Sequence, residues 1–216
     1  MAQGQRGPGM EGWVARWYEK STKKYDPEFR ELADQVAGSV RDGGAVLEVA
    51  PGPGYLAVEL AKRGLDVTGL DISKTFVERG RERASSAGVD VQFVQGDAAH
   101  MPFGNGSFDF LVCRAAFKNF SDPEGALREM WRVLRPGADG LIIDLRRDAR
   151  MSDIVASLYS RHSASLFEQL SGRMIFSTLR KRAYTAAEIE MMLSRVPFAR
   201  ASVERDPIGM SVHLHR

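Results

Sequence analysis

The chain has 216 residues, 44% of them hydrophobic, which is enough for one domain with a substantial buried core. Its 30 basic residues nearly balance 28 acidic residues, and a net charge of +2 argues against a broad surface for nucleic acid. The single cysteine, Cys113, excludes a disulfide framework, and no apolar run reaches the roughly 20 residues of a membrane-spanning helix. We therefore expect a cytoplasmic globular protein with no metal, no nucleic-acid partner and no membrane span; its oligomeric state is left open.

The N-terminal 42 residues predict a tail followed by two helices. Residues 1–10 are polar and glycine-rich, which predicts disorder. Residues 11–42 have helical spacing, with Pro27 opening the second helix. The aromatic side chains of this region either pack the helices onto the domain or form a lid over a substrate, and they are Trp17, Tyr18 and Tyr25.

Residues 45–145 alternate short apolar runs with helical patterns. Strands are predicted over 45–50, 65–70, 89–94, 107–113 and 140–144, and helices over 55–62, 73–87 and 122–134. This alternation predicts βαβ units and a parallel, doubly wound sheet, in which the loops that follow the strands gather at one edge and bind ligands.

The remaining residues extend the same domain, which we place over 11–216. Residues 148–182 look mostly helical and predict a cap inserted after the fifth strand. Residues 185–216 begin with a capping box, Thr185 to Glu188, and a helix follows it. Two β-like segments then predict an antiparallel pair at the sheet edge, over 199–204 and 209–214.

The loop after the first strand contains Gly52-x-Gly54-x-x-Ala57, and Asp71 follows about 20 residues later. This spacing also matches the fingerprint of dinucleotide-binding proteins, so a nicotinamide-dependent oxidoreductase is one candidate. A match to this short pattern alone does not show that the ligand is a dinucleotide.

Two prolines of this loop and an acidic residue of the strand before it favour a ligand without phosphate. Pro51 and Pro53 each remove a backbone N–H donor that a pyrophosphate would need. Glu48, at the end of the strand, would place a negative charge beside that pyrophosphate. These features suit a cationic ligand such as S-adenosylmethionine, which carries a sulfonium and an ammonium group.

A series of motifs in this order and spacing resembles class I S-adenosylmethionine-dependent methyltransferases of type 11, in the branch that includes quinone-biosynthesis and other small-molecule enzymes. The matching segments are 48–54, 70–73, 95–98, 101–103, 107–113 and 134–137. The resemblance implies a Rossmann-like, mostly parallel sheet of seven strands, S-adenosylmethionine as cofactor and a small-molecule methyl acceptor.

The resemblance also assigns residues to the cofactor. They are Glu48 for the ammonium group, Ala50, Gly52 and Gly54 for the amino-acid half, Asp71 for the ribose hydroxyls, Ile72, Asp97 and Ala98 for the adenine, and Arg114 for the methionine portion. One residue departs from the family pattern, because Ala50 replaces its first glycine and alanine tolerates a left-handed backbone poorly. This departure leaves a non-catalytic S-adenosylmethionine-binding protein as a further alternative.

The loop after the fourth strand is expected to face the transferred methyl group. Phe117 and Phe120 are predicted to line the acceptor pocket together with the N-terminal aromatic residues. Lys118 and Asn119 stand where relatives often carry histidines; either residue could orient the acceptor, and the alternative for Lys118 is that it is merely solvated. Methyl transfer depends mainly on positioning, so the sequence names no catalytic base.

Overall fold

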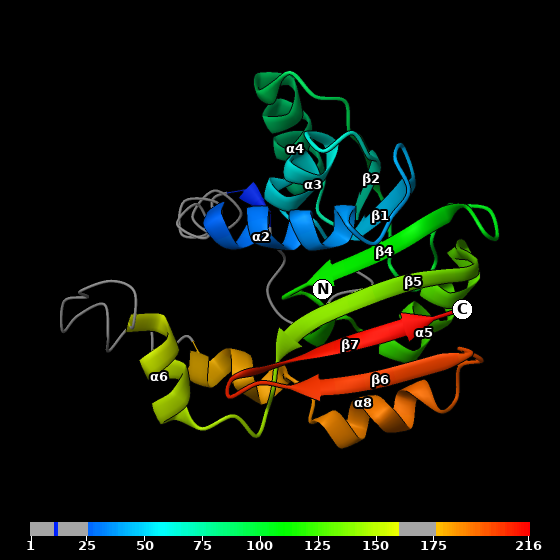
Figure 1. Cartoon of the computed structure of the whole chain (residues 1–216). Coiled ribbons are helices and arrows are strands. Elements are labelled where there is room, and N and C mark those ends of the chain that lie inside the picture. The colour runs from blue at the N-terminus through cyan, green and yellow to red at the C-terminus, as the bar shows by residue number, and fades with distance from the viewer. Residues whose placement is uncertain (1–10, 13–25, 160–175) are drawn as a thin grey trace.

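The computed structural model describes residues 11–12, 26–159 and 176–216, and within these ranges the chain forms one seven-stranded sheet (Figure 1). The strands are β1 (Ala45–Val49), β2 (Asp66–Asp71), β3 (Gln92–Gln95), β4 (Phe108–Arg114), β5 (Leu134–Leu145), β6 (Arg200–Arg205) and β7 (Gly209–His215). Their order is β3-β2-β1-β4-β5-β7-β6. The first five pair in parallel and β7 is antiparallel to both its neighbours, which confirms the predicted doubly wound, mostly parallel sheet.

Helices cover the two faces of this sheet. The helices of the described residues include α2 (Asp26–Ala37), α3 (Tyr55–Ala61), α4 (Lys74–Ala87), the 3-10 helix η2 (Phe117–Asn119), α5 (Pro123–Val133), α6 (Met151–Tyr159) and α8 (Ala186–Leu193). Alternate residues of the central strands enter two separate apolar clusters, one with α2, α3 and α4 and the other with α5 and α8. The sheet is therefore the middle layer of three.

The helix ends follow the signals in the sequence. Ser73 caps α4 by accepting a hydrogen bond from the amide of Phe76 (3.1 Å), and Gly88 ends that helix with a φ of 67°. The capping box between Thr185 and Glu188 is formed at the start of α8. These contacts confirm the predicted starts of both helices.

Two strands begin more than one residue away from their predicted starts. β5 starts at Leu134, six residues before the predicted start, because Leu134 already pairs with Phe108 of β4. Residues 135–138 then leave the ladder where the register with β4 shifts, and Gly137 turns with a φ of 80°. β3 starts late, because the amide of Val89 bonds to the carbonyl of Ala84 and still belongs to the end of α4. In both places the apolar pattern did not reveal the local turn.

Three glycines around the ring of Phe93 bring α4 against the loop after β1. A Cβ atom on Gly80 would lie 2.4 Å from this ring, one on Gly54 2.8 Å and one on Gly69 3.0 Å. Side chains at these positions would therefore push the helix away from the sheet. The glycines set how closely α4 approaches the functional edge.

Several predictions lie outside the described residues: the tail 1–10, most of the first helix, and the side chains of Trp17, Tyr18 and Tyr25. On either side of the gap in the predicted cap, Met151–Tyr159 and 176–182 are helical. In the part of the chain that the structure covers, no helix has the length and hydropathy of a bilayer span.

Candidate functional site

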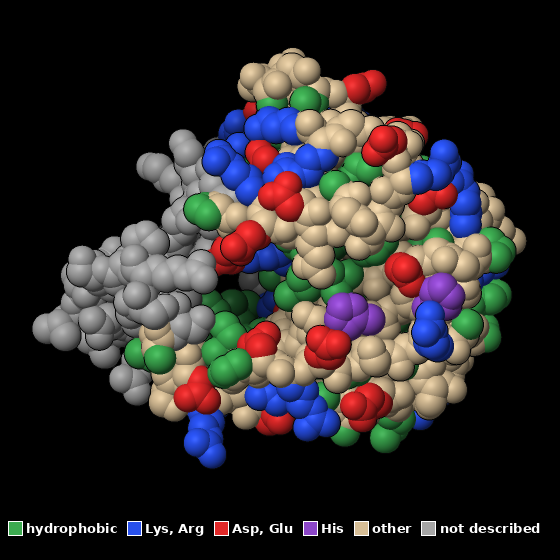
Figure 2. Space-filling view, viewed as in Figure 1, with side chains coloured by type: hydrophobic (Ala, Val, Ile, Leu, Met, Phe, Trp, Pro, Cys, Tyr) green, Lys and Arg blue, Asp and Glu red, His purple; other side chains and the backbone are tan. Residues whose placement is uncertain are grey.

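The ends of three parallel strands bring the main candidate residues together. Glu48 lies opposite Gly69 of β2 and Val112 of β4, so the carboxyl ends of β1, β2 and β4 meet at one edge. Figure 2 shows that the surface is hollowed below α2, beside the tips of β4 and β5 that Figure 1 draws as arrowheads. This is the edge at which parallel α/β sheets bind ligands.

The loop after β1 turns left-handed at every second residue. Ala50, Gly52 and Gly54 have φ values of 57°, 57° and 78°. Ala50 thus adopts the conformation that glycine prefers, although its Cβ makes this unfavourable by about 1–2 kcal/mol. Its amide still bonds to the carbonyl of Leu70 (2.7 Å), which holds the turn against β2.

Glu48 is the most unusual residue of the site, because it is only 4% exposed and its Oε2 atom has no hydrogen-bond partner among the residues that the structure describes. The amide of Ala57, in the first turn of α3, donates to the carboxyl group. The pKa of Glu48 is raised to about 8, mainly by burial; the charge of Asp71 adds to the shift, and the hydrogen bond from Ala57 and the charge of Arg114 oppose it. A cation placed beside Oε2 would satisfy this group.

Asp71, at the end of β2, ties the glycine loop to the start of α4. Its Oδ2 accepts from the amide of Gly52 and its Oδ1 from the amide of Ser73, both at 2.9 Å. The side chain is 5% exposed, and burial raises the pKa of Asp71 to about 6. A carboxylate has about four acceptor positions, so two remain for the hydroxyls of a ligand.

The residues assigned to the adenine follow β2 and β3. Asp97 accepts from the amide of Ala99 through Oδ1 (2.9 Å), which closes a turn, and its Oδ2 lies 3.9 Å from Nδ1 of His100. Ile72 and Ala98 are partly buried. Asp97 therefore shapes the loop, and its contact with adenine stays a prediction.

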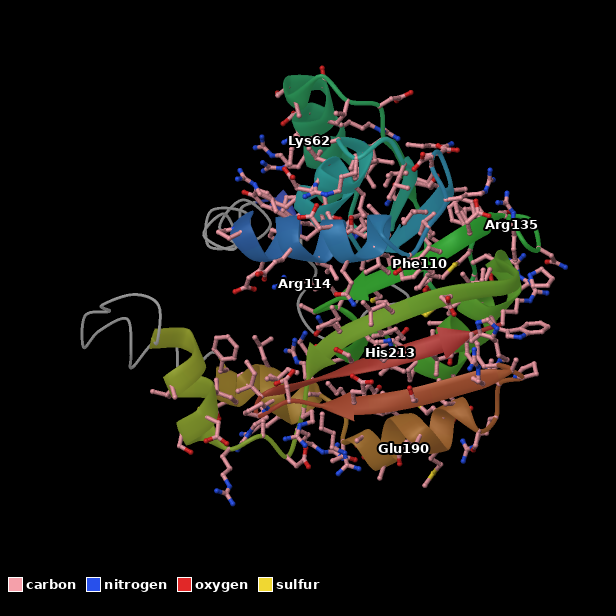
Figure 3. The ribbon with its side chains drawn as sticks, in the orientation of Figure 1. Lys62, Phe110, Arg114, Arg135, Glu190 and His213 are labelled. Atoms are coloured by element: carbon pink, nitrogen blue, oxygen red, sulfur yellow. The ribbon has the colours of Figure 1, made fainter. Side chains whose placement is uncertain are left out.

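Arg114 joins the end of β4 to α2, as its labelled position in Figure 3 shows. Its guanidinium group lies 2.7 Å from the carboxylate of Glu28 and 4.7 Å from the centre of the Phe29 ring. The side chain thus bridges the sheet edge and the helix that covers it. All nine residues assigned to the cofactor lie at or just after the carboxyl ends of β1, β2, β3 and β4.

A contact missed from the sequence involves Glu11, whose carboxylate accepts from the amides of Lys74 (3.0 Å) and Thr75 (3.1 Å). It therefore sits at the first turn of α4, where the helix dipole favours a negative charge. Its own charge raises the pKa of Asp71. Sixty-three residues separate Glu11 from this helix, so no local pattern signals the contact.

The loop after β4 is arranged differently from the expectation of solvated side chains. Lys118 is buried and its ammonium group pairs with Asp144 of β5. The possibility that Lys118 is merely solvated is therefore wrong. Phe117 and Phe120 are buried in the apolar core below the loop, and their contact with an acceptor stays a prediction. Within the described ranges, no three His, Cys, Asp or Glu side chains gather as metal ligands.

Comparisons with known proteins agree on one family. A family model described as a methyltransferase domain matches residues 47–142. A demethylmenaquinone methyltransferase from Deinococcus radiodurans is 34% identical over 133 residues, which cover 60% of this chain and 54% of the relative. A ubiquinone/menaquinone biosynthesis C-methyltransferase from Ectopseudomonas mendocina is 34% identical over 158 residues, which cover 70% and 60%. The chain spans little more than half the length of these relatives.

Solved structures share the fold over nearly the whole chain. A methyltransferase from Aquifex aeolicus, named as dependent on S-adenosylmethionine, has a TM-score of 0.70 at 20% identity and covers 93% of this chain and 97% of its own. The cyclase SpnF also matches, with a TM-score of 0.57 at 18% identity, covering 87% and 80%. Since one of these two proteins is named as a cyclase and not as a methyltransferase, the shared fold by itself does not specify the chemistry.

Proposed function

Because this chain belongs to the class I S-adenosylmethionine-dependent methyltransferases, we propose that it transfers a methyl group from S-adenosylmethionine to a small-molecule acceptor. The observation that carries the proposal is the buried carboxyl group of Glu48, whose Oε2 has no hydrogen-bond partner within the described ranges of the chain. It lies at the carboxyl edge of the sheet, and the neighbouring loop offers few donors to a phosphate because Pro51 and Pro53 lack N–H groups.

The residues present fit the cofactor. Glu48 would hold its ammonium group, and Asp71 would accept from both ribose hydroxyls while it keeps its two backbone donors. Ile72 and Asp97 would contact the adenine, one through apolar packing and the other through its Oδ2. Arg114 would border the methionine portion from the end of β4.

When bound, S-adenosylmethionine supplies an electrophilic methyl group for in-line transfer to a nucleophile. The protein's part is to orient and to exclude water. The left-handed loop at Ala50 and the amides that donate to Asp71 fix the geometry of the floor of the site. Orientation of this kind contributes about 7–11 kcal/mol to lowering a barrier. Glu48, protonated in the free protein at neutral pH, would give up its proton as it takes the ammonium group.

For the acceptor we propose a small apolar molecule with an aromatic ring. Two relatives carry the names of demethylmenaquinone and ubiquinone/menaquinone methylation, which makes a demethylated naphthoquinol the first acceptor to test. Residues 148–182 are proposed as the cap over it. The single buried cysteine and the balanced charge support a cytoplasmic location and a small molecule rather than a nucleic acid as acceptor.

Neither alternative gains support. The family matches argue against a nicotinamide-dependent oxidoreductase. A non-catalytic binder is suggested by Ala50 and by the absence of the histidines that relatives often carry near Lys118 and Asn119; of these two features, Ala50 adopts the left-handed conformation that a glycine would.

Thermal unfolding with added ligands tests the proposal. S-adenosylmethionine and S-adenosylhomocysteine, at about 100 times their dissociation constants, should each stabilise the fold by about 2.7 kcal/mol, and NAD and NADP should not. The Asp71→Ala variant should lose this response. The matched control, Asp66→Ala, changes an exposed residue at the opposite end of the same strand and should keep it. Stabilisation by NAD alone would overturn the proposal, and transfer of labelled methyl to the naphthoquinol would extend it to catalysis.

A further inference from the structure

A buried ion pair lies directly below the turn that follows β4. The Nζ atom of Lys118 is 2.7 Å from Oδ1 of Asp144, and the two side chains are only 6% and 4% exposed. The same carboxylate accepts from the amide of Lys118 (2.9 Å) and from that of Leu145 (2.7 Å). Three donors therefore fix the position of the Asp144 carboxylate, so the ion pair has a defined geometry within the fold.

The ammonium group of Lys118 has a second partner, the carbonyl oxygen of Ala115. Ala115 is left-handed, with a φ of 58°, which an alanine disfavours. Its amide still bonds to the carbonyl of Ile143 in β5 (2.7 Å). Lys118 thus connects the carbonyl of a strained residue at the end of β4 to a carboxylate at the end of β5.

The turn lies next to the site described above. Ala115 follows Arg114, and Val112 of the same strand lies opposite Glu48. Burial raises the pKa of the Cys113 thiol, the charges of Asp144 and Glu48 raise it further and that of Lys118 lowers it, so both the ion pair and Glu48 act on this one side chain. A change in the backbone of the turn would therefore also displace neighbouring residues of the proposed cofactor site.

A buried ion pair adds little net stability, because removing both charges from water costs about as much as their attraction returns. Its main effect is the geometry that it imposes. The burial of Lys118 also argues against direct contact between its side chain and an acceptor.

We propose that Lys118 and Asp144 form a clamp that holds Ala115 left-handed and so positions the backbone of residues 114–116 toward the methionine half of the cofactor. Lys118 is then a positioning residue, not a catalytic one. This inference rests on the proposed function, because it assigns the turn to the cofactor site.

A double-mutant cycle between residues 118 and 115 tests the clamp. Glycine adopts the left-handed conformation without strain, so Ala115→Gly should make the clamp less necessary. Lys118→Met should weaken binding of S-adenosylhomocysteine about tenfold, the size of one hydrogen bond's net contribution. In the Ala115→Gly background the same change should weaken it only about twofold. Calorimetry measures the affinity, and urea unfolding measures the stability of each variant.

The control is Arg63→Met, which removes an ion-pair partner of Asp34 and Glu59 between α2 and α3. It should lower stability and leave the affinity unchanged. If Lys118→Met does not fold, Asp144→Asn takes its place, because it removes the charge and keeps both side-chain positions. It should weaken binding about threefold, again less in the Ala115→Gly background.

Two results would overturn the clamp: a loss of affinity from Lys118→Met that is equal in both backgrounds, or a loss of stability alone, as in Arg63→Met. If the wild-type protein binds no S-adenosylhomocysteine, the proposed function fails and the assignment of the turn to the cofactor fails with it. The stability cycle would then still show whether residues 115 and 118 are coupled, which distinguishes the two failures.

Discussion

The charge state of Glu48 gives a direct test of how the site binds its cofactor. Burial raises the pKa of Glu48 to about 8, so at pH 7 about nine-tenths of the free protein carries this group as a neutral acid. The pKa of Asp71, raised to about 6, leaves that group mostly ionised at the same pH. Between pH 6.5 and 7.5, Glu48 is therefore the group of the pair that still holds its proton.

An ammonium group beside Glu48 favours the carboxylate, so binding of S-adenosylhomocysteine should release close to one proton near pH 7. The affinity should then rise close to tenfold for each pH unit between about 6.5 and 7.5. Above a pH of about 8 Glu48 is already ionised in the free protein, so binding should release no further proton there. We therefore expect the affinity to level off above this pH.

Calorimetric titrations in two buffers of different ionisation enthalpy count the protons released. Glu48→Gln should bind more weakly and release none. Glu190→Gln, which changes an exposed carboxylate on α8 (labelled in Figure 3), should behave as the wild type. A dissociation constant that stays the same from pH 6.5 to 7.5 with no proton release would refute the reasoning, because Glu48 would then be ionised in the free protein or would not contact the ligand.

The same shift has a definite sign for stability without ligand. The pKa of Glu48 is higher in the folded state, about 8, than its ordinary value of 4.5. Its contribution is therefore fully present below pH 4.5 and is lost as the pH rises through 8. The wild type should lose up to about 1.4 kcal/mol of unfolding free energy per pH unit within this window, relative to Glu48→Gln. Urea unfolding at a series of pH values measures the difference.

Three further changes test the local geometry. Gly80→Ala places a Cβ 2.4 Å from the ring of Phe93, and the overpacking cost of about 1–3 kcal/mol should exceed the gain in helix propensity of about 1 kcal/mol; an unchanged urea midpoint would contradict this close packing. Ala50→Gly should stabilise the fold by up to about 1 kcal/mol, because relief of about 1–2 kcal/mol of left-handed strain exceeds glycine's entropy cost of about 0.5–1 kcal/mol; a lower melting temperature would count against the strain. Glu11→Gln should lower the pKa of Asp71, measured by carboxyl NMR, and no shift would show that residue 11 lies elsewhere.

The order of strands and helices could be predicted because it depends on local signals. Apolar runs, the cap at Ser73 and the turn at Gly88 act within a few residues, and the sequence shows them directly. The start of β5 at Leu134 could not be predicted, because residues 135–138 (Arg-Pro-Gly-Ala) interrupt the apolar pattern and a register shift with β4 returns the chain to the sheet. This shift depends on a partner strand and not on the segment itself.

The site was predictable where a motif places a residue at the end of a strand, as with Glu48 and Asp71. It was not predictable where a side chain finds a distant partner. Asp144 is 26 residues from Lys118, and only the parallel pairing of β4 with β5 brings the two together. The left-handed backbone of Ala50 was not predictable from the residue either, because alanine favours a different backbone conformation from the one that the loop requires.

The spacing of glycines in this loop indicates close packing more than it indicates a ligand. Gly54 is left-handed and lies against Gly80 and Phe93, a geometry needed wherever a strand turns into a helix at short distance. A dinucleotide site would use the same glycines. Glu48 distinguishes the two, because its buried carboxyl group would gain from a cation beside it, and its ionised form would repel a pyrophosphate. The acidic residue at the end of β1, rather than the glycines, is therefore the feature that selects a methyl donor.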